Sequence, residues 1–385
     1  MTHLSTPLFF PNPDAAARSR QRSLRIGFDG RLAIGKARGM GRFLRNLIAG
    51  REQDLIGLCA PGESDPGFRL VAGGFQAYPL WEQFSLPALA RQLDLQVLIC
   101  PFNTAPLRLA RSTRLVVVVH DLIFLERRWR AGPGGSWYQR AGRLYRRLVV
   151  PRIIERADRI IAVSDHTARC IRERFAVPPE RIRVIPNTLS TDWYQADGPT
   201  PERKPYVLCV SGEAPHKNLT AGLQAFARCS RPERIECHDL KVVGVSERFH
   251  AHYQEVARHL GIGEQVEFLP QTSDTNLMRL YREASVFFLP SLAEGFGIPA
   301  LEAMASGTPV VVSQTTSLPE VCGTAALYCD PHSVQDMAAA LGSALSDRIL
   351  RQEMSRLGLE QALKYHPAIV AGPIQAFWRD LHEEQ

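Results

Sequence analysis

The chain has 385 residues, of which 45% are hydrophobic and 22% are charged, and its net charge is +7. This length exceeds one ordinary hydrophobic core and predicts a soluble globular protein with two domains. The moderate basic excess fits an anionic ligand or a membrane surface, but it is too weak to indicate nucleic acid as a partner.

The eight cysteines are scattered, and no two have the Cys-x-x-Cys spacing. Cys59, Cys100, Cys209 and Cys329 lie in apolar strand-like runs, where a free cysteine is a common core residue. A disulfide or zinc framework is therefore not expected. No apolar run approaches about 18 residues and no signal-peptide core is present, so we expect a cytoplasmic protein, soluble or peripheral at the inner face of the cytoplasmic membrane.

A first strand is predicted at Leu24–Phe28, and the segment Gly35–Arg42 opens the helix after it. Within this segment, Gly39 and Gly41 lie beside the basic residues Arg38 and Arg42. Glycines and cations between a strand and a helix can form an anion cradle. A Gly-x-Gly pair alone is a weak signal, and a simple loop remains the alternative.

Further strand-like runs alternate with helical patterns in both halves of the chain, which predicts parallel, doubly wound α/β domains. The runs are Ile56–Ala60, Val97–Cys100, Leu115–Val119, Ile160–Val163, Ile182–Ile185, Tyr206–Val210, Leu240–Val243, Val266–Leu269, Val286–Leu289, Val310–Val312 and Ala326–Cys329. The polar, proline-containing segment Ser190–Pro205 is interpreted as a linker. The predicted domains are therefore residues 1–195 and 196–370, with a final helix, Pro373–Glu384, in residues 371–385.

His120 and Asp121 directly follow the apolar run that ends at Val119. Parallel α/β sheets place their chemistry at the carboxyl ends of strands. A histidine there can donate a hydrogen bond to a hydroxyl or phosphate oxygen of a ligand. The alternative is a histidine satisfied by backbone carbonyls.

The segment Arg127–Arg159 contains ten arginines against two acids and includes several aromatic residues. Trp137, Ala141, Leu144 and Leu148 have helical spacing and form an apolar stripe. Either this stripe faces the core and the basic side is solvated, or the segment is a peripheral patch for anionic lipid headgroups or a lipid diphosphate. Pro151 is expected to end this helix or to start another.

In the second half, Ser211 and Gly212 follow a predicted strand, and Lys217 and Asn218 precede a helix. The free N–H groups of a helix start, its dipole and a lysine together form a diphosphate site, with Asn218 as a possible N-cap. The alternative is an ordinary solvated lysine.

The string from Ser291 to Pro309 predicts a strand-loop-helix-strand unit, with Pro299 in the first helical turn and Gly307 at the helix end. Glu294 lies in the loop, and Glu302 is expected near the helix N-terminus, where a carboxylate is electrostatically favoured and can accept two hydroxyl hydrogen bonds. Gly295 and Gly297 allow a ligand to approach backbone N–H groups closely. This pair of carboxylates suits a hydroxyl-rich ligand.

The string from Glu294 to Glu302 resembles the Glu-x7-Glu motif of the retaining nucleotide-sugar glycosyltransferases of the GT-B fold, family four. The glycine segment, the His-Asp-Leu string at His120 and Lys217 with Asn218 resemble the same family, in the same order. The resemblance implies two Rossmann-like domains that face each other across a cleft, with the acceptor on the N-terminal side and the donor on the C-terminal side. It also implies that the final helix crosses back to the N-terminal domain.

By this resemblance, the catalytic residues are His120, Lys217 and Glu294. His120 and Glu294 hold the donor sugar, Glu302 holds the ribose, and Lys217 and the glycine loop face the diphosphate. Arg38 is assigned to the acceptor, and Asp121 either orients His120 or binds the acceptor. The donor-binding residues are Gly39, Gly41, Arg42, Ser211, Gly212, Lys217, Asn218, Glu294, Gly295, Phe296, Gly297, Ile298 and Glu302. Many relatives carry an arginine where this chain has Gly212, so the second phosphate contact is open between His216, Arg42 and Ser211.

The implied reaction is hexose transfer with retention, with GDP-mannose as the leading donor and a UDP-hexose or deoxysugar as alternatives. The implied acceptor is a glycan or a lipid-diphosphate-linked oligosaccharide in cell-surface polysaccharide synthesis, such as lipopolysaccharide or exopolysaccharide. No Asp-x-Asp and no metal-ligand spacing occur in the sequence, so no metal cofactor is expected. A nucleotide-sugar 2-epimerase on the same fold and a non-catalytic nucleotide-sugar-binding partner are the alternatives.

Overall fold

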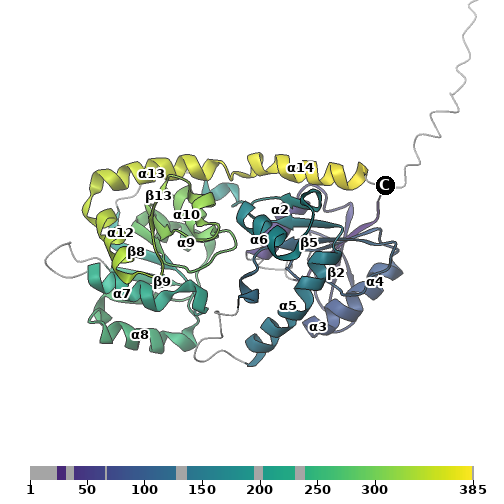
Figure 1. Ribbon diagram of the computed structural model, residues 1–385, viewed down its shortest axis with the longest axis horizontal. Coiled ribbons are helices and arrows are strands. Elements are labelled where there is room, and N and C mark those ends of the chain that lie inside the picture. Colours follow the sequence, from purple (N-terminus) through teal and green to yellow (C-terminus); the bar gives the residue numbers. More distant parts are fainter. Residues whose placement is uncertain are drawn as a thin grey trace, which may run out of the picture.

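The computed structural model describes residues 24–31, 39–65, 67–126, 137–194, 203–229 and 239–383. These residues form two parallel β-sheets that lie side by side and are covered by helices (Figure 1). We call the part built on the first sheet the first lobe and the part built on the second sheet the second lobe. The prediction of an α/β protein with two parallel, doubly wound sheets is confirmed.

The first sheet has seven strands in the order β3-β2-β1-β4-β5-β6-β7. Their bounds are β1 Ile26–Asp29, β2 Leu55–Cys59, β3 Arg69–Ala72, β4 Val97–Cys100, β5 Arg114–Val119, β6 Arg159–Ala162 and β7 Ile182–Val184. The edge strand β3 was not predicted, because its residues are exposed or half-buried and lack the apolar run of a buried strand.

The second sheet has six strands in the order β10-β9-β8-β11-β12-β13. Their bounds are β8 Lys204–Val210, β9 Asp239–Val243, β10 Val266–Leu269, β11 Ala284–Leu289, β12 Val310–Ser313 and β13 Ala326–Cys329. The predicted domain boundary between residues 195 and 196 lies outside the described residues.

Helices connect the strands of both lobes. Those of the first lobe are α2 Met40–Ile48, α3 Tyr78–Leu80, η1 Trp81–Ser85, α4 Leu86–Gln92, η2 Ile123–Leu125, α5 Trp137–Arg156, α6 Asp165–Phe175, η3 Pro179–Arg181 and η4 Thr191–Trp193. Those that follow are η5 Pro215–Lys217, α7 Leu219–Cys229, η6 Glu247–Phe249, α8 His250–His259, η7 Gly263–Gln265, α9 Asp274–Glu283, α10 Ile298–Ala305, α11 Leu318–Cys322, α12 Val334–Ser346, α13 Arg348–Leu363 and α14 Pro367–Glu383.

The central strands are buried on both faces, which explains their continuous apolar runs. In β5, Val116 and Val118 belong to one core cluster, whereas Val117 and Val119 belong to a cluster on the opposite face of the sheet. The first of these clusters also contains Tyr281 of the second lobe. One apolar core therefore extends through both lobes.

Helix α14 follows the second lobe in sequence but packs on the first lobe. The indole Nε1 of Trp378 donates to the carbonyl oxygen of Leu47 at 2.9 Å, and Asp380 forms an ion pair with Arg183. In Figure 1, α13 and α14 run end to end along one side of both lobes. The helix begins at Pro367 and not at Pro373 as predicted, because packing of its apolar side chains offsets the backbone hydrogen bond that Pro373 removes.

Helix α5 differs from its prediction in two ways. It continues through Pro151 without a break. The predicted apolar stripe does not face the core, because Leu144 and Leu148 are 59% and 53% exposed. The buried face begins further along the helix, at Val149. Between residues 140 and 148, α5 therefore presents leucines and arginines to solvent.

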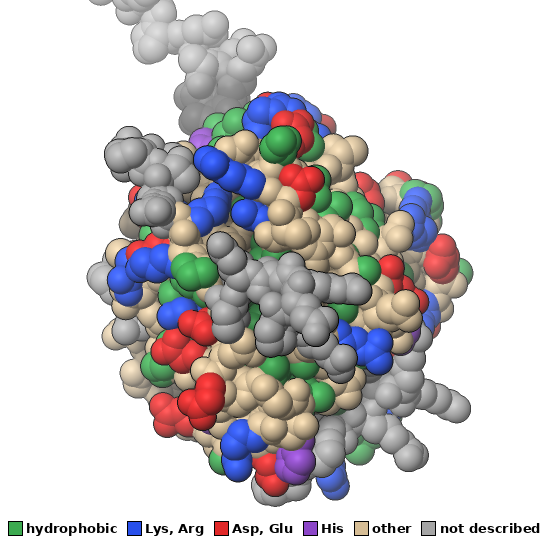
Figure 2. All heavy atoms as spheres, turned by 90° about the vertical axis from the view of Figure 1, so that its left-hand side faces the viewer, with side chains coloured by type: hydrophobic (Ala, Val, Ile, Leu, Met, Phe, Trp, Pro, Cys, Tyr) green, Lys and Arg blue, Asp and Glu red, His purple; other side chains and the backbone are tan. Residues whose placement is uncertain are grey.

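The described residues contain no helix with both the length and the apolar composition needed to cross a membrane. Figure 2 shows the end of the molecule that the second lobe forms. On this face, basic and acidic side chains are interspersed, and hydrophobic side chains occur in small groups.

Candidate active site

Lys217 and Glu294 form an ion pair although 77 residues separate them. The Nζ atom of Lys217 lies 2.8 and 3.0 Å from the two carboxylate oxygens of Glu294. Lys217 follows β8 and Glu294 follows β11, and these strands are neighbours in the second sheet. Because the carboxyl ends of parallel strands lie at the same edge of a sheet, Lys217 and Glu294 lie close together at that edge.

The carboxylate of Glu294 is held in its charged form. The hydroxyl of Ser291 donates to its Oε1 at 2.6 Å. Burial acts to raise the pKa of Glu294, but the Lys217 ammonium and the hydrogen bonds from Lys217 and Ser291 outweigh it and lower the pKa. The backbone N–H of Glu294 donates to Oγ1 of Thr316 at 2.9 Å, which fixes the loop. Ser291 and Thr316 were not predicted, since neither has a sequence signal of its own.

His120 lies at the end of β5 and is buried against Phe43, with ring centroids 5.4 Å apart. Its Nε2 lies 2.8 Å from the carbonyl oxygen of Pro101, which can only accept, so the proton is on Nε2. Burial lowers the pKa of His120 to about 4, so the ring is neutral at neutral pH. A neutral ring with its proton on Nε2 can only accept at Nδ1. The predicted donation by His120 to a ligand is therefore replaced by donation to Pro101.

Gly295 brings the two lobes into direct contact. An ideal Cβ at this position would lie 2.1 Å from the carbonyl oxygen of His120 and 3.0 Å from the Cβ of Asp121. No side chain fits in this space. In the first lobe, the hydroxyls of Ser164 and Thr167 donate to the carbonyl oxygen of Gly295 at 2.9 and 3.3 Å.

Asp121 is held by its own turn. Its Oδ1 accepts from the backbone N–H of Ile123 at 3.0 Å. Burial raises its pKa despite that hydrogen bond and the nearby Arg146. Asp121 therefore lies beside the His120–Gly295 contact with one oxygen engaged locally.

Glu302 belongs to a second group of contacts. The hydroxyl of Tyr281 donates to its Oε2 at 3.0 Å, and Arg42 of the first lobe lies 3.7 Å from its Oε1. Arg42 also bonds Asp274 at 2.9 Å and so bridges the lobes. Among the described residues, Glu302 makes no hydrogen bond or ion pair with Lys217 or Glu294.

Two expectations for Glu302 are corrected. Helix α10 begins at Ile298 and has no acidic residue in its first turn, so Glu302 lies just past the first turn and not within it. Burial raises its pKa to about 7, and neither Arg42 nor the Tyr281 hydroxyl offsets this. Burial therefore outweighs the groups that favour the charged form of Glu302, and the partner Tyr281 was not predicted.

The loop after β8 contains a buried hydroxyl without a partner. The Oγ of Ser211 has no hydrogen bond, and the residue is 8% exposed. An ideal Cβ at Gly212 would have only the carbonyl oxygen of Gly244 within 4 Å, at 3.9 Å. The free space in this loop therefore lies at Gly212, next to the buried hydroxyl of Ser211.

Asn218 does not act as the predicted N-cap. Its Nδ2 donates to the carbonyl oxygens of Pro290 and Pro331 at 3.0 and 2.8 Å, and its backbone has a φ of 57°. This tie holds the Lys217 segment against the loop that carries Glu294.

The remaining predicted residues have different positions. Phe296 is buried and packs edge-on against Tyr365, so its side chain belongs to the core. Gly297 has a φ of 105° and precedes α10, which begins at Ile298. Gly39 precedes α2 with a φ of 37°, and Gly41 is buried in the first turn of α2. Arg38 lies outside the described residues.

A carboxylate from the second lobe binds the N-terminus of α6. Oε1 and Oε2 of Glu320 accept from the backbone N–H groups of Asp165 and His166 at 2.8 and 3.0 Å. These N–H groups have no acceptor within their own helix. Glu320 therefore joins the two lobes close to the Gly295 contact, and sequence reasoning did not find it.

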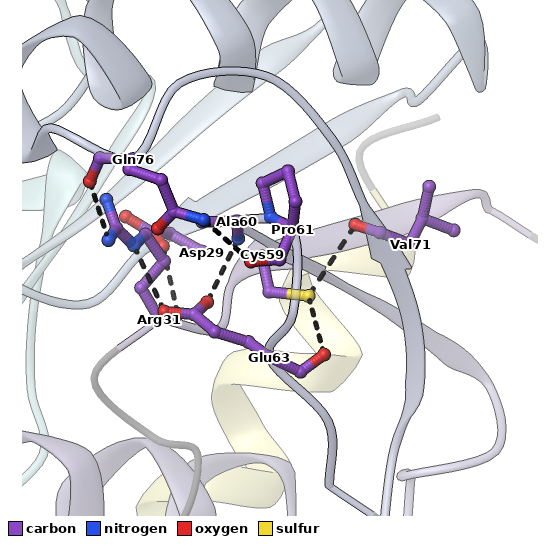
Figure 3. A network of polar contacts seen from close by, with 8 residues as sticks. All are labelled: Asp29, Arg31, Cys59, Ala60, Pro61, Glu63, Val71 and Gln76. Carbon is purple, nitrogen blue, oxygen red and sulfur yellow. Dashed lines mark hydrogen bonds and ion pairs between the residues drawn. The ribbon is translucent and has the colours of Figure 1, made fainter.

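The ends of β1 and β2 carry a further polar cluster that was not predicted (Figure 3). Nη2 of Arg31 donates to the carbonyl oxygen of Gln76 at 3.0 Å, and its Nε lies 3.5 Å from Glu63. The backbone N–H of Arg31 donates to Asp29 at 3.2 Å, and burial raises the pKa of Asp29 to about 7. The sequence contained a signal for Asp29, because it directly follows the predicted strand Leu24–Phe28, just as His120 directly follows the predicted strand that ends at Val119.

Comparison with known proteins identifies the class. Residues 40–193 match the family model described as Glycosyltransferase Family 4, and residues 191–361 match the model described as Glycosyl transferases group 1. Together with the two parallel sheets and the Lys217–Glu294 site, these matches show that the chain belongs to the glycosyltransferases of the GT-B fold.

The relatives include named mannosyltransferases. The chain is 32% identical to the MMP alpha-(1->4)-mannosyltransferase of Mycolicibacterium hassiacum, over 63% of this chain and 59% of that protein. It is 33% identical to the O-antigen chain mannosyltransferase B of Escherichia coli, over 55% of this chain and 58% of that protein. The chain thus spans less than two thirds of the length of these relatives. Among solved structures, the Anabaena HepE complex with UDP-glucose has a TM-score of 0.67 at 16% identity and covers 93% of this chain and 100% of that one.

Proposed function

We propose that this protein transfers a hexose from a nucleotide diphosphate sugar to a hydroxyl of a glycan, with retention of the anomeric configuration. The Lys217–Glu294 ion pair beside His120 and Gly295 carries the proposal. It joins a cation suited to a diphosphate with a carboxylate suited to sugar hydroxyls.

In the proposed reaction, the acceptor oxygen bonds to the anomeric carbon of the donor sugar. The bond from this carbon to the β-phosphate oxygen breaks, and the acceptor proton passes to that phosphate oxygen on the same face. The leaving group is a nucleoside diphosphate. Lys217, Arg42 and the N–H groups at the start of α2 supply positive charge for it, and no metal ion is part of the proposal.

The other site residues have matching roles. The unpartnered hydroxyl of Ser211 suits a phosphate oxygen and supports its assignment as the second phosphate contact. Glu302, oriented by Tyr281, accepts from the ribose hydroxyls. Glu294 and Nδ1 of His120 accept from hydroxyls of the donor sugar. Lys217 and Glu294 form an ion pair with each other in this structure. In the proposed complex, Lys217 instead contacts the diphosphate of the donor, and Glu294 contacts its sugar.

We propose mannose from GDP-mannose as the transferred group, because two relatives are named mannosyltransferases. The neighbour that holds UDP-glucose makes a UDP-hexose the alternative. Since one relative is named for the O-antigen chain, the proposed acceptor is a lipid-linked oligosaccharide of cell-surface polysaccharide synthesis.

Residues 140–152 of α5 suit a peripheral contact with an anionic membrane. Leu144 and Leu148 are more than half exposed, and Arg140 and Arg152 are exposed on the same helix. Leu148→Glu should reduce sedimentation with vesicles that contain phosphatidylglycerol, whereas Leu359→Glu on α13 should not. Equal sedimentation of both variants and the wild type would remove the membrane contact from the proposal.

The test is a thermal-shift panel of GDP-, UDP- and ADP-sugars followed by product analysis. The true donor should raise the melting temperature. Lys217→Ala should remove this rise and reduce transfer by about 100-fold or more, whereas Lys364→Ala on the surface should change neither. An altered sugar formed without acceptor would indicate an epimerase. Binding without turnover would indicate a non-catalytic protein.

A further inference from the structure

A cavity of about 410 Å³ lies between the lobes next to Glu294. The first lobe contributes η2 and one face of α6, namely His166, Cys170, Glu173 and Arg174. The second lobe contributes the loop at residues 292–295 and the threonines at 315 and 316. Small-molecule sites commonly have volumes of about 300–1,000 Å³.

The cavity touches only one end of the proposed donor site. Glu294 and Gly295 line it, whereas Lys217, Arg42 and Glu302 do not. A group in this cavity therefore meets the donor sugar away from the residues assigned to the diphosphate and the ribose. This position suits the acceptor, which must reach the donor sugar, and does not suit the nucleotide of the donor.

The charges in the cavity disfavour an anion. Asp121, Glu126, Glu173 and Glu294 line it, against the cation of Arg174 and the imidazole of His166. Arg174 is paired with Glu126, and Glu294 is paired with Lys217 behind the cavity wall, each at 2.8 Å, so Asp121 and Glu173 remain. Burial and the nearby Arg169 lower the pKa of His166, so it is neutral at neutral pH. Acids therefore exceed cations around the cavity.

The polar groups of the cavity suit hydroxyls instead. Glu173 makes no hydrogen bond or ion pair with any described residue, so its carboxylate can accept from a ligand. The hydroxyl oxygen of Thr167 donates to Gly295 and lies 3.0 Å from the Ser164 hydroxyl, and its second lone pair can accept from a ligand. Carboxylates and hydroxyls with few cations are a lining for an uncharged sugar.

We propose that this cavity binds the terminal, uncharged sugar of the acceptor and that any phosphate of the acceptor lies outside it. The inference rests on the proposed function and adds the acceptor's place and charge. Glu173 and Cys170 are then specificity residues on α6, because their side chains bound the space that the sugar occupies.

The experiment follows donor consumption with the nucleotide sugar that gives the largest thermal shift. Two probes share one ring and differ in charge, methyl α-mannoside and α-mannose 1-phosphate. The neutral probe should alter donor consumption at concentrations at least about tenfold lower than the charged one. Glu173→Lys should narrow this ratio, whereas Glu180→Lys, with the same charge change outside the cavity on the same lobe, should not.

A second pair of variants tests the space itself. Cys170→Phe fills the cavity and should raise the KM for methyl α-mannoside about tenfold, with an unchanged donor thermal shift. Arg172 is exposed on the same helix. Arg172→Phe should therefore leave both the KM for methyl α-mannoside and the donor thermal shift unchanged. If the donor binds but neither probe affects its consumption, or if Cys170→Phe and Glu173→Lys behave like their controls, the inference is wrong and the donor chemistry stands. If no nucleotide sugar binds the wild type, the proposed function fails and the inference fails with it.

Discussion

The space for a side chain at Gly295 is filled by the backbone of His120, since a Cβ would lie 2.1 Å from its carbonyl oxygen. Gly295 follows Glu294 in the second lobe, and His120 directly follows β5 in the first. The distance between the two proposed sugar-binding residues thus depends on the absence of a side chain at one position.

Gly295→Ala should separate the lobes at this contact. Because a displacement of about 1 Å can cost about 100-fold in rate, we expect a loss of kcat/KM of that order. Gly372→Ala in α14 is the control, since a Cβ there has nothing within 4 Å. Steady-state kinetics of both variants measure the effect. A Gly295→Ala protein with wild-type kcat/KM would contradict the close contact.

Glu320→Ala should weaken the contact between the lobes. The N–H groups of Asp165 and His166 lose their acceptor, and loss of a helix cap costs about 1 kcal/mol. We expect a lower melting temperature and a larger radius of gyration by X-ray scattering. Glu360→Ala, which removes an exposed ion pair with Arg356, should change neither. Identical scattering of the Glu320 variant and the wild type would rule out this role.

Glu302 should make stability fall as pH rises. Its pKa is raised to about 7 in the folded protein, from 4.5, so the folded state keeps a proton that the unfolded chain has lost. Stability is then lost between about pH 4.5 and pH 7, by about 3 kcal/mol. Glu302→Gln should flatten this dependence in urea denaturation between about pH 5 and pH 8.

The matched control is Glu360→Gln on the surface. Asp29, whose pKa is also raised to about 7, contributes the same slope to both variants and to the wild type. The difference between the Glu302 variant and the wild type therefore isolates Glu302. A parallel pH profile for the two would mean that its pKa is not raised.

Chelation should leave transfer intact. In the proposed site, Lys217, Arg42 and helix N–H groups meet the charge of the leaving diphosphate. We expect the rate in excess EDTA to stay within about twofold of the untreated rate. The measurement is nucleoside diphosphate release with and without EDTA. Loss of the rate in EDTA and its recovery with Mg²⁺ would show that a metal ion takes part.

The sequence by itself determined the two parallel sheets and the residues that end their strands. Buried parallel strands need continuous apolar runs, and side chains directly after such runs share one edge of a sheet. This reasoning placed His120 at the end of a strand, whereas the resemblance to the glycosyltransferase family assigned Lys217 and Glu294 to one site. The reasoning from apolar runs failed for β3, because an exposed edge strand needs no apolar run.

Only the tertiary structure decided which atoms meet across the lobes. His120 donates to Pro101, and Glu302 contacts Tyr281 and Arg42. These contacts join segments that are distant in sequence, so no local pattern predicts them. The exposure of Leu144 and Leu148 likewise depends on what packs against α5. Helical spacing identifies a stripe but not the surface that covers it. A pKa depends on burial and neighbours, and both are set by the complete fold.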